Sequence, residues 1–168
     1  MRGIAVYPGS FDPITKGHTA ILHSGLVAFE KIIVAVLNND SKKPLFSVAE
    51  RMEMIRESAD EMGADPGRIE VDSFDGLLVS YAQSRNARVI LRGLRAVADF
   101  EYELQMANMN RHLSQDVETV FIMANDAYFY VASNLVKEVA RLGKTGPGTR
   151  PATLPPSLVT SLTRLDAT

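Results

Sequence analysis

A turn-rich segment near the N-terminus of the chain ends in a histidine. Residues 8–18 contain two prolines, two glycines and Ser10, and His18 stands where a stretch of helical periodicity begins. The first turn of a helix has unpaired N–H groups and the positive end of the helix dipole, which together suit an anion. The segment therefore predicts an anion site to which Ser10 and His18 donate hydrogen bonds. The alternative is that Gly17 permits a turn and His18 is a half-buried surface histidine.

Basic residues appear in two further segments. Residues 38–44 form a polar loop that contains Lys42. Farther along, Arg92 and Arg95 enclose Gly93, which would let the backbone approach a ligand closely. Arginine suits phosphate because its planar guanidinium donates two parallel hydrogen bonds. The alternatives at this stage are a solvated lysine loop and arginines that pair with nearby carboxylates, namely Asp99 or Glu103.

The pattern of apolar residues predicts the elements that position these groups. Short runs rich in Val and Ile predict strands at residues 3–7, 31–37, 68–71, 88–91 and 119–123. Helical segments lie between them: Ser47 and Glu50 form a capping box, and Asp75 or Gly76 opens the next helix. Two more helices are predicted at 99–113 and 134–142, with Gly143 ending the second.

Strands that alternate with helices indicate an α/β fold. We expect one domain over residues 1–168: a doubly wound, Rossmann-like, five-stranded parallel sheet with helices on both faces. Residues 143–156, rich in Pro and Gly, read as a connector to a short C-terminal helix. Ligands of such sheets bind at the carboxyl ends of the strands.

The candidate groups all follow predicted strands, so we expect them at one edge of the sheet. They are Ser10, His18, Lys42, Arg92, Arg95 and a helix start near residue 133, where Ser133 or Asn134 is the predicted N-cap. The formal net charge of the chain is only -2, so basic groups gathered at one edge have little other explanation. The simplest ligand for them is one with several phosphates.

Composition narrows the class of protein. Hydrophobic residues make up 46% of the chain and charged residues 23%, as in a folded soluble domain. The net charge gives no reason to expect nucleic acid or anionic membranes as partners. The absence of cysteine rules out disulfides and thiolate chemistry. No secretory signal is apparent at the N-terminus, so a cytoplasmic protein is expected.

Two stretches of the sequence resemble a known enzyme family. Residues 15–18, Thr-Lys-Gly-His, resemble the T/H-x-G-H signature of the nucleotidyltransferase superfamily. Residues 92–111, RGLRAVADFEYELQMANMNR, and residues 41–46, SKKPLF, are similar to bacterial phosphopantetheine adenylyltransferases. The likeness extends from the N-terminus to about residue 143.

The resemblance implies that ATP and 4′-phosphopantetheine react to give dephospho-coenzyme A and pyrophosphate. It implies Mg²⁺ as cofactor with no protein metal ligand, coenzyme A as feedback ligand, and a homohexamer. His18 would stabilise the transition state. ATP would contact Ser10, Phe11, His18, Gly93, Leu94, Arg95, Glu103, Tyr128, Phe129, Tyr130, Val131, Ala132, Ser133 and Asn134. The acceptor would contact Ser10, Lys42, Leu78, Arg92, Met106, Met109 and Asn110, although the methionines would by default be core residues.

The chain departs from the family pattern in two places. Residues 131–134 read Val-Ala-Ser-Asn where the family usually has Ile-Ser-Ser-Ser, so Ala132 offers no hydroxyl to the triphosphate. The connector 143–156 is longer and richer in Pro and Gly than usual. Two other functions compete: a related nucleotidyltransferase with a different acceptor or CTP, and a catalytically silent nucleotide-binding module. A flavin or dinucleotide domain is disfavoured because no G-x-G-x-x-G follows the first strand.

Overall fold

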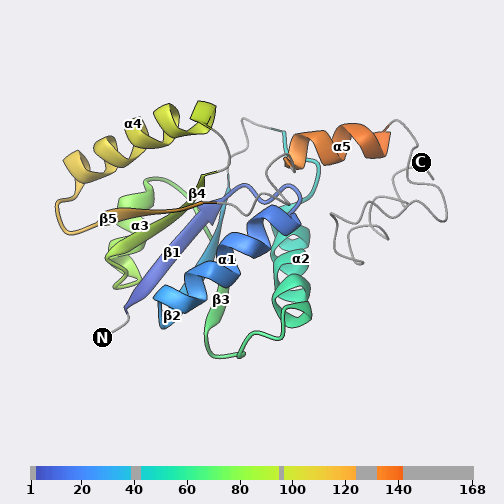
Figure 1. Ribbon diagram of the computed structural model, residues 1–168, viewed down its shortest axis with the longest axis horizontal. Helices are drawn as coiled ribbons and strands as arrows, with labels where there is room; N and C mark the ends of the chain where they lie inside the picture. The colour runs from blue at the N-terminus through green and yellow to red at the C-terminus, as the bar shows by residue number, and fades with distance from the viewer. Residues whose placement is uncertain (1–2, 39–42, 95–96, 124–131, 142–168) are drawn as a thin grey trace.

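The structure is a computed structural model, and it describes residues 3–38, 43–94, 97–123 and 132–141. Its centre is a five-stranded sheet in the order β3-β2-β1-β4-β5 (Figure 1). The strands are β1 (Ile4–Gly9), β2 (Lys31–Leu37), β3 (Ile69–Phe74), β4 (Val89–Leu94) and β5 (Glu118–Met123). Every neighbouring pair is parallel. The strand order reverses between β1 and β4, and the carboxyl ends of these strands form the switch point at which doubly wound sheets bind ligands.

Helices pack on both faces of the sheet, as expected. Figure 1 shows α1 (Lys16–Ala28) and α2 (Val48–Glu61) in front of the sheet and α3 (Leu78–Ser84) behind it. The long helix α4 (Val97–Leu113) lies along β5, and α5 (Ser133–Arg141) lies beyond the start of α2. None of the helices among the described residues is long and apolar enough to cross a membrane.

Alternating side chains of the central strands build two hydrophobic cores. In β2, Ile32 and Val34 face the core under α1 and α2, whereas Ile33 and Ala35 face the core under α3. Successive residues of a strand point to opposite faces, so a strand buried on both sides is apolar throughout. This arrangement explains why the apolar runs of the sequence predict β1 and β2 as strands.

Several predicted boundaries were wrong by a few residues. β1, β3 and β4 run to Gly9, Phe74 and Leu94, because pairing with neighbouring strands continues past the apolar runs. Arg92 and Gly93 are therefore strand residues. The third helix begins at Leu78, since Gly76 adopts a positive φ of 81° that belongs to a turn. α4 starts at Val97, two residues earlier than expected.

The predicted capping box at the start of α2 is confirmed. The Ser47 N–H donates to Oε2 of Glu50 at 2.8 Å, and the Glu50 N–H donates to Oγ of Ser47 at 3.3 Å. The Ser47 hydroxyl also donates to Oε2 of Glu50 at 2.7 Å, and this bond together with that from the Ser47 N–H lowers the pKa of Glu50, since both stabilise the ionised carboxylate. Residue 143, the predicted end of the last helix, and the connector 143–156 lie outside the described residues.

Gly93 is required by helix packing. A Cβ added at this position would lie 2.8 Å from Cγ1 of Ile21, on the buried side of α1. We therefore expect Gly93→Ala to lower the free energy of unfolding by about 1–3 kcal/mol through overpacking. Urea denaturation would measure the loss. Gly67→Ala is the matched control, because its added Cβ would approach no atom closer than 3.6 Å; equal stability of the two variants would contradict the prediction.

Candidate active site

A cleft of about 720 Å³ opens at the carboxyl ends of β1 and β4. Residues near the starts of α4 and α5 line it, including Asp99 of α4 and Ser133 of α5. Nine of the residues predicted from the sequence line this cleft, which confirms that the fold brings them together. They are Ser10, Phe11, His18, Arg92, Gly93, Glu103, Ala132, Ser133 and Asn134.

Other predicted residues lie elsewhere. Leu94, Leu78, Met106, Met109 and Asn110 are described but are not part of the cleft lining. Met106 and Met109 are exposed on α4, so the default expectation that they are core residues was wrong. Six more predicted residues lie outside the described part of the chain: Lys42, Arg95, Tyr128, Phe129, Tyr130 and Val131.

Thr15 fixes the orientation of the His18 ring. The backbone N–H of Thr15 donates to Nδ1 of His18 at 3.0 Å, and the Thr15 hydroxyl lies 2.9 Å from the same nitrogen. A backbone N–H can only donate, so Nδ1 must be the acceptor and the neutral ring carries its proton on Nε2. The imidazole therefore has a defined donor, Nε2–H, at the wall of the cleft.

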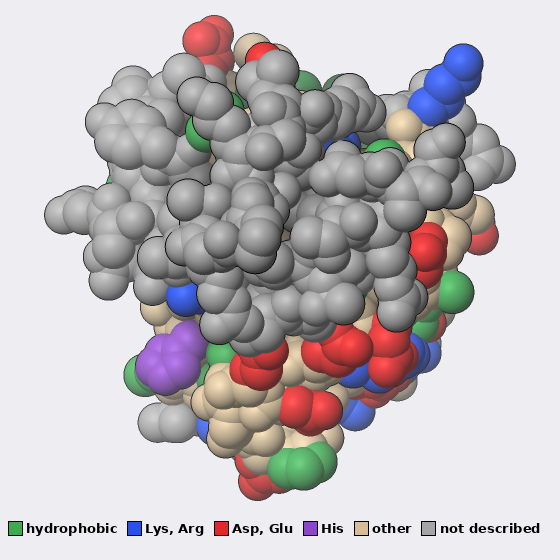
Figure 2. Space-filling view, turned by 90° about the vertical axis from the view of Figure 1, so that its right-hand side faces the viewer, with side chains coloured by type: hydrophobic (Ala, Val, Ile, Leu, Met, Phe, Trp, Pro, Cys, Tyr) green, Lys and Arg blue, Asp and Glu red, His purple; other side chains and the backbone are tan. Residues whose placement is uncertain are grey.

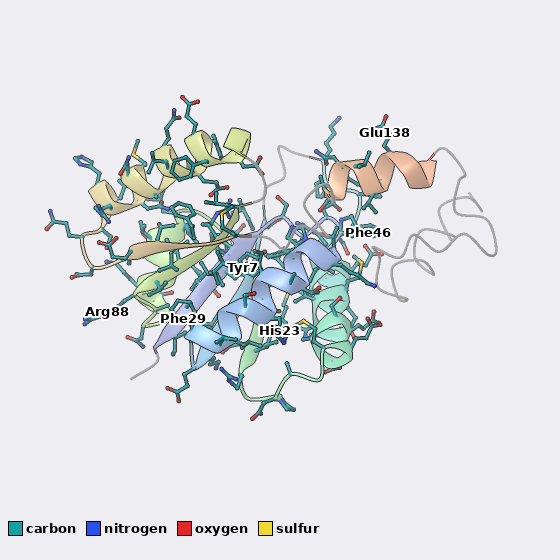
Figure 3. All side chains as sticks on the ribbon, viewed as in Figure 1. Tyr7, His23, Phe29, Phe46, Arg88 and Glu138 are labelled. Atoms are coloured by element: carbon teal, nitrogen blue, oxygen red, sulfur yellow. The ribbon has the colours of Figure 1, made fainter. Side chains whose placement is uncertain are left out.

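The loop before α1 is held by aromatic packing. Phe11 is only 2% exposed, and its ring packs edge-on against both Tyr7 and His18, at centroid distances of 5.4 and 5.2 Å. Its φ of 46° is rare for a non-glycine residue and places the ring over Gly9. A Cβ at Gly9 would lie 2.9 Å from that ring. Figure 3 shows Tyr7 at the centre of the molecule, next to α1.

Arg92 forms a bidentate ion pair with Glu103, so the pairing with a carboxylate that the sequence left as one alternative is present. Nε and Nη2 donate to the two carboxylate oxygens at 2.7 and 2.5 Å, and Nη1 donates to the carbonyl of Pro8 at 2.9 Å. Burial alone would lower the pKa of Arg92, but the hydrogen bonds and charge of Glu103 raise it above its ordinary value. The guanidinium is thus a fixed cation that joins β1, β4 and α4.

The start of α5 forms another part of the cleft wall. Ser133 is the first residue of the helix, and its hydroxyl donates to the carbonyl of Pro13 at 2.8 Å. The prediction that Ser133 or Asn134 precedes the helix as its N-cap was therefore wrong. The contact instead ties α5 to the loop after β1. The first-turn N–H groups of α5 lie beside the cleft, where an anion is favoured.

Sequence reasoning did not assign four charged residues of the cleft wall to the site: Asp12, Arg51, Asp99 and Lys137. Nζ of Lys137 lies 2.7 Å from Oδ2 of Asp12. The signal for Arg51 was available, because it falls on the same helical face as Met54 and Ile55, and Arg51 is the charged residue of that buried face. A charged residue on a buried helix face indicates a specific partner.

The ionisation of Asp12 contributes to stability. Burial raises the pKa of Asp12, but hydrogen bonds from Lys137 and from two backbone N–H groups together outweigh burial. The resulting pKa lies below the ordinary value of 3.8. Since the folded-state pKa is the lower one, this stabilisation is present above the unfolded pKa and is lost as pH falls through the folded value.

We therefore expect Asp12→Asn to lower the free energy of unfolding near neutral pH by about 3 kcal/mol, as when one partner of a buried ion pair is removed. The gap between the variant and the unsubstituted protein should narrow as pH falls below the ordinary pKa of 3.8 and through the lower pKa of folded Asp12, because the unfolded chain binds the proton first. Thermal denaturation from pH 7 to pH 2.5 checks this. A gap that stays constant over the whole range would contradict it.

Comparison with known proteins places the chain in a class. Residues 6–139 match a family model described as Cytidylyltransferase-like. The fold and the cleft together thus define a nucleotidyltransferase. Two curated relatives, both called phosphopantetheine adenylyltransferase, are each 51% identical over 164 residues. The match with the protein from Anaeromyxobacter sp. (strain K) covers 98% of both chains, and that with the protein from Anaeromyxobacter dehalogenans (strain 2CP-C) covers 98% of this chain and 95% of the relative. The chain belongs to the phosphopantetheine adenylyltransferase family.

Solved structures support the fold. A bifunctional NMN adenylyltransferase/ADP ribose pyrophosphatase from Francisella tularensis has a TM-score of 0.70 at 15% identity; all of this chain matches 51% of that one. The chain therefore spans about half the length of that bifunctional protein. The nicotinic acid mononucleotide adenylyltransferase of Plasmodium falciparum complexed with APC has a TM-score of 0.68 at 13% identity, over 99% of this chain and 96% of that one.

Proposed function

We propose that this protein transfers the adenylyl group of ATP to 4′-phosphopantetheine, giving dephospho-coenzyme A and pyrophosphate in coenzyme A synthesis. The acceptor is supported by the name of relatives that are 51% identical over nearly the whole chain. The observation that carries the chemistry is the oriented imidazole of His18 in the wall of the cleft at the switch point.

The reaction needs no covalent intermediate. The acceptor phosphate is already a nucleophile, so the enzyme has to align it with the α-phosphate of ATP and stabilise the charge that develops. Nε2–H of His18 would donate to the α-phosphate in the transition state. The backbone N–H groups at the start of α5 would hold the β and γ phosphates, which makes the missing hydroxyl at Ala132 less important.

Mg²⁺ is proposed as the cofactor, bound through the phosphates of ATP. Among the described residues, no group of three or more His, Asp or Glu side chains is arranged to hold a metal. Three carboxylates line the cleft: Asp12 pairs with Lys137, Glu103 pairs with Arg92, and the third is Asp99. Magnesium commonly binds through substrate phosphates and keeps several waters, so it would neutralise phosphate charge without a protein cage.

A pyrophosphate-release assay tests the proposal. The purified protein should release pyrophosphate with ATP, 4′-phosphopantetheine and Mg²⁺, and should release none when any of these is omitted. CTP in place of ATP, and nicotinamide mononucleotide in place of the acceptor, should give little product. Activity with another nucleotide or acceptor would instead indicate a related nucleotidyltransferase, and no activity with any pair would favour a silent binding module.

A homohexamer is proposed as the assembly, supported by apolar residues that the single chain leaves exposed. Tyr102 and Met109 on α4 are 62% and 54% exposed, and Met123 at the end of β5 is 68% exposed. Exposed apolar groups in such numbers commonly mark contacts with other chains. Light scattering of the purified protein would give its mass in solution.

Small anionic ligands are the proposed partners of the protein, and coenzyme A is the proposed feedback ligand. The proposed location is the cytoplasm. Figure 2 shows several Asp and Glu side chains together on one side of the molecule, among the described residues. On α2 the exposed acidic residues include Glu50, Glu53, Glu57, Asp60 and Glu61. Such a surface repels nucleic acid and anionic membranes. Calorimetric titration with coenzyme A would test the feedback ligand.

A further inference from the structure

Two buried charged side chains in the wall of the cleft have no place in the chemistry above. Asp12 is 5% exposed and Arg51 is 2% exposed. Asp12 belongs to the loop between β1 and α1. Arg51 lies near the start of α2, four residues after the N-cap Ser47. Burying a charge is costly unless the group is paired and hydrogen-bonded, so each of these residues needs a reason to be there.

Asp12 connects the loop after β1 to the loop before α2. Its Oδ2 accepts the backbone N–H of Leu45 at 3.0 Å, and its Oδ1 accepts that of Phe46 at 2.9 Å. These hydrogen bonds cross 33 and 34 residues of sequence. Lys137 of α5 donates to the same carboxylate, and Figure 3 shows Phe46 between α2 and α5. One side chain therefore holds three separate segments at the edge of the cleft.

Arg51 connects α2 to the loop after β1 and to the end of β2. Its Nη1 donates to the carbonyl of Ser10 at 2.8 Å, in the loop after β1, and more distantly to the carbonyl of Leu37 at 3.5 Å, at the end of β2. Its Nε lies 3.4 Å from the carbonyl of Ser47. Burial lowers the pKa of Arg51, and the opposite charge of nearby Asp12 offsets part of that shift. The guanidinium thus joins both ends of the segment 37–47 to the loop that carries Ser10.

We infer that Asp12 and Arg51 are positioning residues, which fix the separation of the loop after β1 from the loop after β2. The first loop carries Ser10 and leads to His18, and the sequence of the second includes Lys42, the predicted acceptor-phosphate residue. The inference rests on the proposed function, in which groups of the two loops hold two different reactants. In-line transfer is sensitive to their alignment, and a displacement of about 1 Å can cost roughly 100-fold in rate.

Three variants test this role. Asp12→Asn keeps the size of the side chain but replaces one carboxylate oxygen by an NH₂ group, which cannot accept the hydrogen bond from Leu45 or Phe46. Asp12→Glu keeps the charge, and Arg51→Lys keeps the charge but removes the planar fork. The matched control is Arg56→Lys, because Arg56 is exposed on the same helix and pairs only at the surface with Glu53.

We expect Asp12→Asn and Arg51→Lys to lower kcat by about 10- to 100-fold well below their melting temperatures, with the KM for ATP changed by less than about threefold. Asp12→Glu should recover part of that loss, and Arg56→Lys should behave as the unsubstituted protein. Amide hydrogen exchange at Leu45 and Phe46 should be faster in Asp12→Asn and Arg51→Lys.

Stability without a kinetic role would give the opposite pattern: lower melting temperatures with an unchanged kcat, which would overturn the inference. If Asp12→Asn fails to fold, Arg51→Lys and Asp12→Glu decide by the same criteria. If the unsubstituted protein releases no pyrophosphate, the proposed function fails by itself. Amide exchange, which needs no substrate, then decides: unchanged rates at Leu45 and Phe46 in Arg51→Lys would overturn the positioning role.

Discussion

Replacing His18 with alanine is expected to lower kcat by about 10²–10³-fold, the usual loss when one donor to the transition state is removed. The imidazole lines the cleft and is held by Thr15 through Nδ1, so little reorganisation of the ring is needed during reaction. The KM values for both substrates should change less than kcat, because the donor acts mainly on charge that develops in the transition state. Steady-state kinetics of pyrophosphate release measures both parameters.

His23→Ala is the control for this variant. His23 lies on the same helix, α1, and is exposed (Figure 3). Its replacement should leave kcat unchanged. The His18 variant should also keep the circular dichroism and melting temperature of a folded protein, since the ring lies at the cleft and is not part of either hydrophobic core. Near-normal turnover by a folded His18→Ala protein would contradict the assignment.

The second large effect is expected from Arg92→Ala, as a rise of about 10- to 100-fold in the KM for 4′-phosphopantetheine. Hydrogen bonds to charged groups contribute about 1.5–3 kcal/mol each, and this variant would lose the cation proposed to bind the acceptor phosphate. It would also leave Glu103 without its bidentate partner, so that a carboxylate near the site repels an incoming phosphate. Initial rates over a range of acceptor concentrations, at saturating ATP, measure the effect.

Two further variants separate these causes. Arg92→Lys keeps the positive charge but cannot match the two oxygens of Glu103 in one plane, so an intermediate KM is expected. Arg88→Ala is the control, because Arg88 is exposed immediately before β4 (Figure 3). An unchanged acceptor KM in Arg92→Ala would rule out its role as phosphate ligand and leave Arg92 as a structural link between β1, β4 and α4.

The sequence by itself determined the parallel α/β fold and the edge at which the site lies. Both depend on local signals. The apolar runs of β1 and β2 predict strands buried on two faces, and Ser47 with Glu50 predicts the start of α2 through contacts three residues apart. His18 could be placed at the cleft because it follows a strand and begins a helix, which is a matter of order along the chain.

Only the tertiary structure decided which charged groups face one another. Arg92 meets Glu103 because β4 and α4 pack together, and Asp12 meets Lys137 across 125 residues. Gly93 lines the cleft as predicted, but its lack of a side chain is required by the contact with Ile21, which the sequence did not reveal. Local propensity carries no information on such pairs, since their geometry depends on how helices pack on the sheet, and burial makes the pairing necessary because an unpaired charge in that position would be too costly.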